Sequence, residues 1–530
     1  MSLIRNVGTI GGLTMVSRLF GFARDMMLAR ILGAGAAADA WQLAFQLPNI
    51  FRRLFAEGAF SAAFVPLFNR RMAGPGSEDE DRAAAQNFAV EVMSVLLPVL
   101  IVFSALAMLA MPWVVWLIDD FGQGGRTNDF TINLARITFP YLIFISVMTV
   151  FAAILNSISR FAAAAAAPVL LNLCIIAALL FVLWSDGGAD PRRAAYFVGF
   201  AAATAGLLQM TWLFYWVRKA GFRFPLHRPR LTPEVRELGV LILPAIFGAG
   251  IYQISRFIDL FFLGRLPEGS FVYLAMADRL NQLPLGIIGI ALGTAILPAL
   301  SRFIARQDQG GAQRVQSNAI EIGLLLTVPA AVGLYFAAEP LATAIYRGGK
   351  FDAGDVAMTA ATLAMLVTGL PAYVLVKVLT PGFFARRDTR TPVWTAAAAL
   401  TLNIILNIAL IPRMGIAGLA LASALSAWAN CAMLYVLLHR RGHFHLERDL
   451  LGRIARIAIS AAAMGAAIYA LSPALHGWFG GNLGERVMSV SVLVGTGAFV
   501  YFALAWLTGA IDRSKIAMLT RKTAPQETAQ

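Results

Sequence analysis

The stretch DAWQLAFQLPNIFRRLFAEGAFSAAFVPLFNR, Asp39–Arg70, is apolar enough to cross a bilayer and yet carries two acidic and two basic residues before its last turn. At about 3.6 residues per turn, one helix face holds a polar stripe of Gln42, Gln46, Asn49, Arg53 and Glu57. A charged side chain near the centre of a membrane helix costs roughly 2.5–3.5 kcal/mol and usually faces a bundle interior or a watery cavity. The stripe therefore predicts a buried polar pathway.

The whole chain has the composition of an integral membrane protein. Of its 530 residues, 59% are hydrophobic and 14% are charged, and the mean hydropathy is +0.71, which lies outside the range of soluble domains. Its formal charge of +14 is spread over short loops without a nucleic-acid motif, so we expect no nucleic-acid partner. The N-terminal apolar run carries charges and lacks a cleavage site, which indicates a first spanning helix and not a signal peptide.

Apolar runs of about 20 residues or more predict fourteen transmembrane helices in an all-α polytopic protein. The expected spans are 7–31, 39–69, 87–118, 131–158, 162–184, 193–217, 237–263, 270–301, 317–337, 355–384, 392–411, 415–438, 454–472 and 486–509. If the N-terminus is cytoplasmic, the cytoplasmic loops and tails hold 25 Arg and Lys residues and the opposite loops nine. This asymmetry follows the positive-inside rule and favours an even number of spans with both termini cytoplasmic.

An internal repeat links the two halves. Pro140-Tyr141 matches Pro371-Ala372-Tyr373, and Leu171-Asn172 matches Leu402-Asn403, both at an offset of 231. The repeat relates helices 1–6 to helices 7–12 in parallel, about an axis normal to the membrane. We therefore expect an N-lobe over residues 1–220, a C-lobe over 221–445, and two further helices with a cytoplasmic tail over 446–530.

Charged residues inside three predicted helices are the candidates for substrate binding. They come from the first, second and eighth spans: Arg18, Arg24, Asp25, Asp39, Arg52, Arg53, Glu57, Asp278 and Arg279. Five are arginines, whose planar forks suit phosphate or carboxylate. The alternative interpretation is that they form internal ion pairs, as the i,i+4 spacing of Arg53 and Glu57 allows. We interpret Asn172, Asn403 and Asn407 as interhelical hydrogen-bond residues and not as ligands.

Signals for catalysis or a cofactor are weak. There is no Walker A sequence, and the histidines of HRRGHFH, His439–His445, lack acidic or cysteine companions at metal-ligand spacing. Cys174 and Cys431 lie in apolar runs and are interpreted as small buried hydrophobes. The acidic run Ser77–Arg82 is interpreted as a solvated loop. We expect no metal, no cofactor and no enzyme activity, with transport driven by the membrane potential or an ion gradient.

Three long blocks carry a resemblance to a known family. FRRLFAEGAFSAAFVPLFNR (Phe51–Arg70), ADRLNQLPLGIIGIALGTAILPALSR (Ala277–Arg302) and FFARRDTRTPV (Phe383–Val393) resemble the MurJ/MviN family of bacterial lipid II flippases. That family belongs to the multidrug/oligosaccharidyl-lipid/polysaccharide exporter superfamily. The resemblance covers nearly the whole chain, with Arg387 as a departure in a loop.

The resemblance implies a fold of two six-helix lobes plus two helices, and a function. The function is alternating-access movement of undecaprenyl-pyrophosphate-linked disaccharide-pentapeptide, lipid II, from the inner to the outer leaflet of the cytoplasmic membrane. The family's cavity residues correspond to the nine candidates above, and its lipid-tail groove corresponds to 454–472 and 486–509. The implied partners are lipid II, membrane lipids and proteins of cell-wall synthesis, and we expect a monomer.

Two other functions stay open at this point. A related exporter could carry another polyprenyl-linked saccharide, or drugs in exchange for cations, although five arginines in the cavity argue against cationic drugs. An intramembrane enzyme acting on polyprenyl phosphates would need an acidic metal cluster, and the candidate acids each have arginines nearby in the sequence.

Overall fold

The computed structural model of the chain describes residues 3–55, 59–119, 128–225 and 228–511. Within these ranges the secondary structure is helical, apart from short connections and one isolated antiparallel bridge between Gly348 and Phe351. The chain divides into two compact units. The first comprises Met1–Met276 and Tyr346–Asp355, and the second comprises Ala277–Ile345 and Val356–Gln530.

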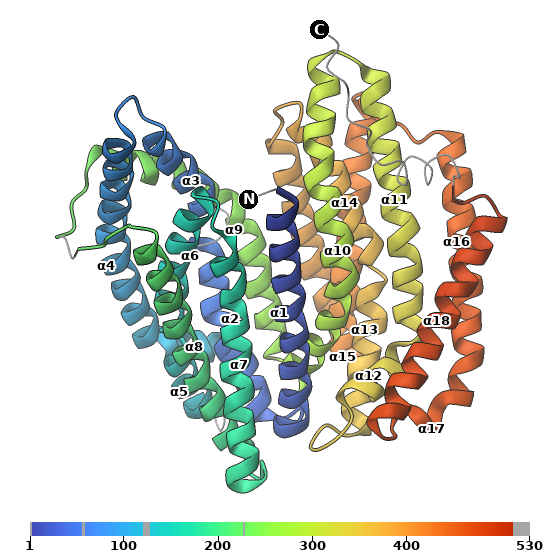
Figure 1. Ribbon diagram of the computed structural model, residues 1–530. Helices are drawn as coiled ribbons and strands as arrows, with labels where there is room; N and C mark the ends of the chain where they lie inside the picture. The colour runs from blue at the N-terminus through green and yellow to red at the C-terminus, as the bar shows by residue number, and fades with distance from the viewer. Residues whose placement is uncertain (1–2, 56–58, 120–127, 226–227, 512–530) are drawn as a thin grey trace. The chain divides into compact units, whose positions relative to one another are not determined.

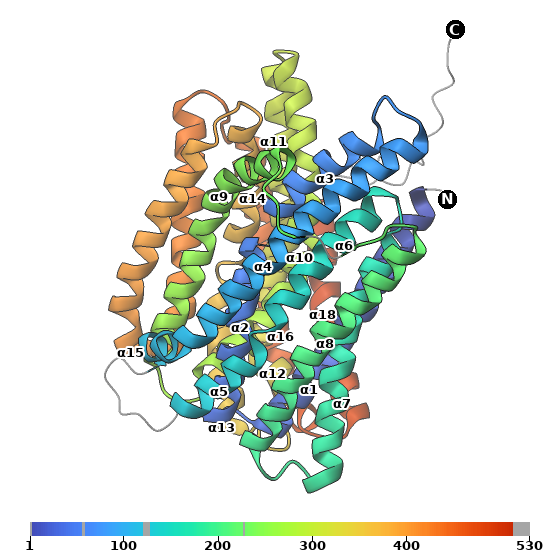
Figure 2. The same ribbon diagram turned by 90° about the vertical axis from the view of Figure 1, so that its left-hand side faces the viewer.

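The first unit contains the helices from α1 to the first residues of α10 (Figure 1). They are α1 Leu3–Leu32, α2 Ala36–Phe55, α3 Ala59–Met72, α4 Glu78–Asp119, α5 Asn128–Thr138, α6 Tyr141–Ser157, α7 Phe161–Asp186, α8 Pro191–Lys219, α9 Pro233–Leu263 and the start of α10 Ser270–Ala305. Helix α7 packs against α1 and α8, and α7 and α8 lie side by side along their length (Figure 2).

The second unit holds the remainder of α10 and the helices that follow it, except for Tyr346 and the first turn of α13, which belong to the first unit. These are α11 Gln309–Phe336, α12 Ala338–Tyr346, α13 Ala353–Val367, α14 Leu370–Phe384, α15 Arg390–Arg440, α16 Arg448–Leu471, the 3₁₀ turn Ser472–Leu475, α17 His476–Phe479 and α18 Leu483–Leu507. Helix α16 packs between α11 and α18. Small residues permit this close approach, because a Cβ at Gly465 would crowd Phe336 and one at Gly497 would crowd Ile468.

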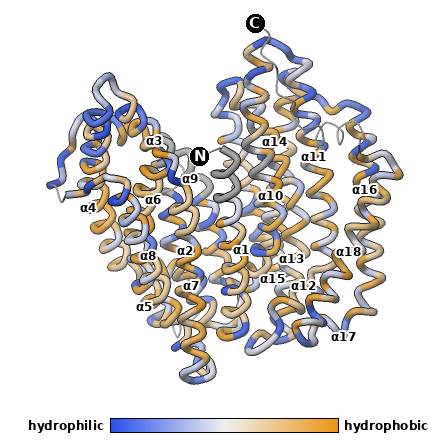
Figure 3. Tube along the Cα trace, viewed as in Figure 1, coloured by the Kyte–Doolittle hydropathy of each residue, from blue (hydrophilic) through white to orange (hydrophobic). Residues whose placement is uncertain are grey.

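The distribution of hydropathy fits a protein that crosses a membrane several times (Figure 3). Among the described residues, nine helical segments are long and apolar enough to span a bilayer. The predicted spans outside this set are 7–31, 39–69, 237–263 and 270–301. Each of these four includes residues whose side chains the structure does not describe, and only described residues enter this set.

Every one of the fourteen predicted spans overlaps a helix, although their number stays a prediction. The predicted spans 392–411 and 415–438 fall within α15, whose backbone is non-helical at Gly415 (φ 56°, ψ −133°) three residues after Pro412. Span 39–69 corresponds to α2 and α3, and residues 56–58 between them lie outside the described residues.

The predicted repeat has a structural counterpart in two broken helices. The helix that contains Pro140 divides into α5 and α6, and the helix that contains Pro371 divides into α13 and α14. A proline has no N–H to continue the ladder and disfavours a helical residue before it, so each break lies at or just before the matched proline. The predicted lobe boundaries near residues 220 and 445 are based on this repeat and stay a prediction. The compact units are defined by spatial proximity, and the long stretch of the first unit ends at Met276.

Aromatic packing fixes α3 against α4 in the first unit. Phe64 stacks on Phe60, Phe68 and Phe88 with ring centroids 5.3, 5.6 and 5.4 Å apart. The guanidinium of Arg71 lies 4.1 Å from the centroid of the Phe88 ring, a cation–π contact that covers the end of the stack. In a membrane such close packing, and not water exclusion, holds helices together.

The acidic run Ser77–Arg82 begins a helix, so its interpretation as a loop is wrong. Glu78 begins α4, and four acidic residues occupy its first turn. The backbone N–H of Glu80 donates to Ser77 Oγ (3.4 Å) and that of Ser77 donates to Glu80 Oε2 (2.9 Å), which is a capping box. Negative charge at a helix N-terminus also interacts favourably with the helix dipole.

Candidate functional site

Arg24 on α1 has a buried guanidinium that is held by hydrogen bonds to neighbouring side chains. Arg24 and Asp25 are 8% and 4% exposed. The Nε and Nη2 atoms of Arg24 both donate to Asp25 Oδ1, at 3.0 and 2.7 Å. Its Nη1 donates to Asn172 Oδ1 on α7, also at 3.0 Å. Three of the five donors of the guanidinium are thus occupied, which fixes its plane inside the first unit.

The side-chain amide of Asn172 links α7 to α1 through both its oxygen and its nitrogen. Besides accepting from Arg24, it donates through Nδ2 to the backbone carbonyl of Ser17 at 3.0 Å. The prediction that Asn172 is an interhelical hydrogen-bond residue is confirmed. In the matched position of the repeat, Asn403 accepts from Asn407 Nδ2 at 3.1 Å, within α15. The repeat therefore preserves the residue type and not the partner.

Arg18 and Arg53 present guanidinium groups at exposed positions of α1 and α2. Within the part of the chain that the structure describes, neither makes a hydrogen bond or an ion pair with another residue. Exposed cations on helices of a membrane protein are costly in lipid. We therefore expect both guanidinium groups to face water or an anionic group.

Arg52 and Asn49 form a local chain on α2. The Nε atom of Arg52 donates to Asn49 Oδ1 at 3.2 Å, and Asn49 Nδ2 donates to the carbonyl of Phe45 at 2.7 Å. Asn49 of the polar stripe and Arg52 beside it are thus half-buried and hydrogen-bonded along the helix. Glu57, the last residue of the stripe, lies outside the described residues, so its predicted pairing with Arg53 stays a prediction.

Asp39 caps another helix. Its Oδ2 accepts from the backbone N–H of Gly269 at 2.6 Å, and its Oδ1 accepts from that of Val272 at 3.1 Å, at the N-terminus of α10. The first N–H groups of a helix have no intrahelical partner and carry partial positive charge. A carboxylate from α2 satisfies two of them, so Asp39 has a structural role that sequence reasoning did not identify.

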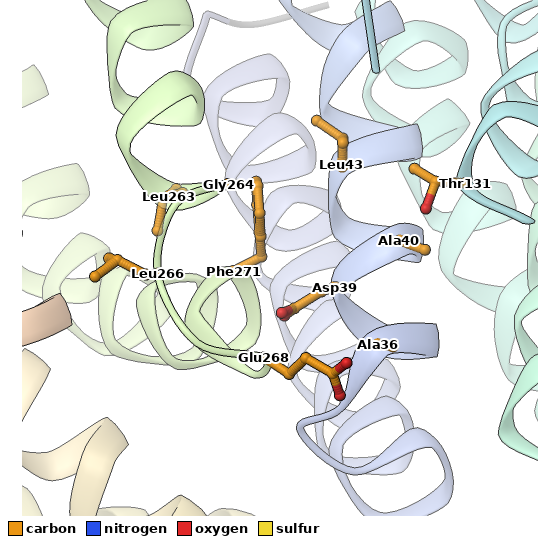
Figure 4. A pocket seen from close by; sticks show the side chains of 10 residues that line it. All are labelled: Ala36, Asp39, Ala40, Leu43, Thr131, Leu263, Gly264, Leu266, Glu268 and Phe271. Atoms are coloured by element: carbon orange, nitrogen blue, oxygen red, sulfur yellow. The ribbon is translucent and has the colours of Figure 1, made fainter. Parts of the chain in front are cut away.

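A small pocket lies beside this cap (Figure 4). It is lined by polar groups of Asp39, Glu268 and Thr131 and by the apolar side chains of residues such as Leu43 and Phe271. Figure 4 shows Asp39 and Glu268 projecting from α2 and from the turn before α10. Its ionisable lining residues are acidic, so this pocket is not the predicted cationic cavity.

Asp278 and Arg279 lie in the second unit, on α10, and both are half-buried. Asp278 Oδ2 accepts from Gln282 Nε2 at 2.5 Å, one turn along the helix. Among the candidates, the structure shows an ion pair between the sequence neighbours Arg24 and Asp25. The predicted cavity shared by the three helices stays a prediction.

Groups for other chemistry are few. Among the described residues, no group of three or more His, Cys, Asp or Glu side chains is placed to hold a metal ion. Cys174 is half-buried and Cys431 is buried, and both are free thiols. The arrangement supplies fixed positive charge and hydrogen-bond donors, which can hold an anionic group.

The comparisons with known proteins identify the family. The family model described as "Lipid II flippase MurJ" matches residues 28–488. The "Probable lipid II flippase MurJ" of Rhizobium tropici is 39% identical over 99% of this chain and 98% of its own length. That of Rhizobium meliloti (strain 1021) is 38% identical over 99% and 97%. The "Lipid II flippase MurJ" of Burkholderia cenocepacia is 32% identical over 96% and 98%.

Solved structures show the same fold. "Lipid II flippase MurJ, inward closed conformation" superposes with a TM-score of 0.75 at 24% identity, over 94% of this chain and 98% of that one. An inward-facing multidrug resistance MATE family transporter of the MOP superfamily gives a TM-score of 0.62 at 14% identity, over 82% and 97%. By its sequence along almost its whole length, the chain belongs to the MurJ family.

Proposed function

We propose that this chain is a lipid II flippase, which moves the undecaprenyl-pyrophosphate-linked disaccharide-pentapeptide from the inner to the outer leaflet of the bacterial cytoplasmic membrane. The observation that carries this function is the 39% identity over 99% of the chain to a relative named as a probable lipid II flippase. The helical, multi-pass structure with nine apolar spanning segments among its described residues agrees with a transporter of the inner membrane.

The charged residues supply a physical reason for an anionic head group. Arg18 and Arg53 are exposed on helices that also carry the buried Arg24 and the half-buried Arg52. Guanidinium groups bind phosphate oxygens in pairs of parallel hydrogen bonds. Such groups can replace the water around a pyrophosphate while the polyprenyl tail stays in lipid. We include Asp39, Glu57, Asp278 and Arg279 in the substrate pathway as predicted from the sequence.

Alternating access is the mechanism that we propose for this movement. One charge that crosses 100 mV changes in free energy by roughly 2.3 kcal/mol. Outward movement of an anion is favoured when the cell interior is negative, and the empty cationic cavity must then return against the field. An ion gradient or the membrane potential therefore drives the cycle. We place both termini in the cytoplasm, because 25 loop and tail cations then face inward and nine outward.

The test is the leaflet distribution of lipid II in cells that depend on this chain. Depletion should lower the amount of outer-leaflet lipid II detected by a membrane-impermeant probe, and the wild-type chain should restore it. Arg24→Ala and Arg279→Ala should insert normally and fail to restore it. The matched control is Arg193→Ala, which removes an exposed guanidinium paired with Asp186 at 3.1 Å outside the proposed pathway.

The outcomes separate the proposed cargo from the alternatives. An unchanged lipid II distribution after depletion would exclude this cargo and point to another polyprenyl-linked saccharide or to drug export. Full activity of both arginine variants would exclude the cationic cavity while leaving the cargo in place. Chemical turnover of lipid-linked substrate by the purified chain would establish an enzyme.

A further inference from the structure

Three prolines inside helices share an unusual hydrogen-bond arrangement. A proline has no N–H, so the carbonyl four residues before it loses its intrahelical donor. In a membrane protein such a carbonyl must find another partner, because no water in the bilayer core can replace the lost bond. In this chain, side chains from other helices donate to the carbonyls released by Pro48, Pro112 and Pro329.

The first case lies in α2, among the predicted site residues. Pro48 releases the carbonyl of Ala44, and the Thr138 hydroxyl of α5 donates to that carbonyl at 2.7 Å. Thr138 and Ala44 are both fully buried. The hydroxyl also lies 3.1 Å from the carbonyl of Ala135 in its own helix, a longer contact with an atom that already belongs to a helix ladder. The interhelical bond is therefore the shorter of the two.

The second case uses the same end of α5. Pro112 of α4 releases the carbonyl of Met108, and Arg136 Nε donates to it at 3.0 Å. Arg136 and Thr138 are two residues apart, immediately before the break at Pro140. One helix end thus supplies both α2 and α4 with the donor that their prolines lack. Arg136, a charged residue inside the predicted span 131–158, thus has a structural use.

The third case occurs in the second unit and repeats the chemistry with different residue types. Pro329 of α11 releases the carbonyl of Leu325, and the hydroxyl of Tyr501 on α18 donates to it at 2.7 Å. A threonine, an arginine and a tyrosine thus meet the same requirement. The arrangement thus occurs in both units with three different donor side chains.

We propose that Thr138 is a positioning residue for transport, which fixes the direction of the second half of α2 at Pro48. The first half of α2 is held by Asp39 at the N-terminus of α10. The second half carries Arg52 and Arg53. A proline is a point at which helices bend, so the bond from Thr138 to Ala44 decides where these two guanidinium groups lie. The expected effect on transport rests on the proposed function. The expected effect on stability rests on the hydrogen bond alone.

A double-mutant cycle between Thr138 and Pro48 tests the inference. Thr138→Val removes the hydroxyl at nearly constant shape and leaves the carbonyl of Ala44 without a donor. Pro48→Ala restores a backbone N–H that can bond to Ala44 within α2. Thr138→Val should therefore lower the thermal midpoint of the purified protein in the wild-type background and leave it unchanged in the Pro48→Ala background. The half-buried thiol of Cys174 and the buried thiol of Cys431 allow the midpoint to be followed with a thiol-reactive dye.

The transport arm uses vesicles that contain the purified chain and fluorescent lipid II, with a membrane-impermeant quencher. Thr138→Val should lower the initial rate of translocation at least fivefold, and Thr138→Ser, which keeps the hydroxyl, should stay within twofold of wild type. The matched control is Thr149→Val on α6, because the Thr149 hydroxyl donates within its own helix to Ile145 at 2.9 Å. That variant should transport at the wild-type rate.

Each outcome has a defined meaning. If Thr138→Val lowers the thermal midpoint equally in the wild-type and Pro48→Ala backgrounds, the hydrogen-bond coupling is overturned. Coupled midpoints with wild-type transport by Thr138→Val would overturn the positioning role. If the wild-type chain does not translocate lipid II while the midpoints remain coupled, the proposed cargo fails and the link between Thr138 and Pro48 stands.

Discussion

The carboxylate of Asp39 accepts a hydrogen bond of 2.6 Å from the backbone N–H of Gly269, which lies 230 residues later in the chain. Gly269 has φ +93°, and a Cβ there would approach the Ala34 carbonyl oxygen to 2.7 Å. A glycine is thus required at this position on two counts, conformation and space. The contact fastens α2 to the start of α10 and gives a candidate acid of α2 a partner that is not substrate.

Replacement of Asp39 tests this cap. Asp39→Ala should lower the free energy of unfolding by about 0.5–2 kcal/mol, the usual cost of losing an N-cap. Asp39→Asn keeps an oxygen acceptor and loses the charge, so it should retain part of this stability. Thermal unfolding in detergent measures both variants. Glu268→Gln is the matched control, because Glu268 lines the same pocket and is exposed; an equal loss in that variant would contradict the capping role.

Removal of Asn172 should loosen the buried arginine of α1. Asn172→Ala takes away the acceptor of Arg24 Nη1 and the donor to Ser17. A hydrogen bond to a charged group contributes about 1.5–3 kcal/mol, so the thermal midpoint should fall clearly and transport should fall with it. Asn407→Ala provides a comparison, because it removes the donor to Asn403, the residue that matches Asn172 in the repeat, and so breaks a contact within α15. Wild-type stability of Asn172→Ala would show that Arg24 does not depend on this amide.

Acid should weaken the turn between α14 and α15 through Asp388. The hydroxyl and N–H of Thr391 and the guanidinium of Arg441 all donate to its carboxylate, at 2.6, 3.0 and 2.6 Å. These donors, those of Thr391 foremost, lower the pKa of Asp388 from 3.8 to about 2. Since the pKa is lower in the folded state, this stabilisation is complete above pH 4 and is lost as the pH falls from about 4 to about 2.

A pH series of thermal midpoints measures this effect. The wild-type chain should lose stability over that window relative to Asp388→Asn, whose amide does not titrate there. The exposed carboxylate of Glu339 on α12 offers a control variant, Glu339→Gln, which should follow the wild-type curve. Parallel curves for wild type and Asp388→Asn would mean that the carboxylate does not contribute in its charged form.

The sequence predicted the helices better than it predicted the use of their polar residues. Apolar runs specify a spanning helix directly, because every backbone group in lipid must be bonded within the segment. The breaks at Pro140 and Pro371 follow from proline chemistry and were visible as matched motifs. The start of α4 was missed, although Ser77 and Glu80 have the spacing of a capping box.

The roles of Asp39 and Asn172 depend on which helices become neighbours, and helical periodicity carries no information on that. Their partners, Gly269 and Ser17 with Arg24, are 230, 155 and 148 residues distant. The donors to released carbonyls could have been sought, since each interior proline announces a carbonyl without a donor four residues earlier. The identity of the donor still required the fold.

Tyr501 tests whether a side-chain donor compensates for the bond that an interior proline removes. A control residue of the same type lies on the adjacent helix. Tyr501→Phe deletes only the hydroxyl that bonds to the Leu325 carbonyl, in a side chain that is 1% exposed. An unsatisfied buried acceptor costs about 1–3 kcal/mol, so the thermal midpoint should fall. Tyr469→Phe alters a side chain that is 70% exposed on α16 and should have no effect. Pro329→Ala returns an N–H to α11, and in that background Tyr501→Phe should become neutral. If it remains equally destabilising there, Tyr501 stabilises α18 through packing alone, and the proline does not explain its hydrogen bond.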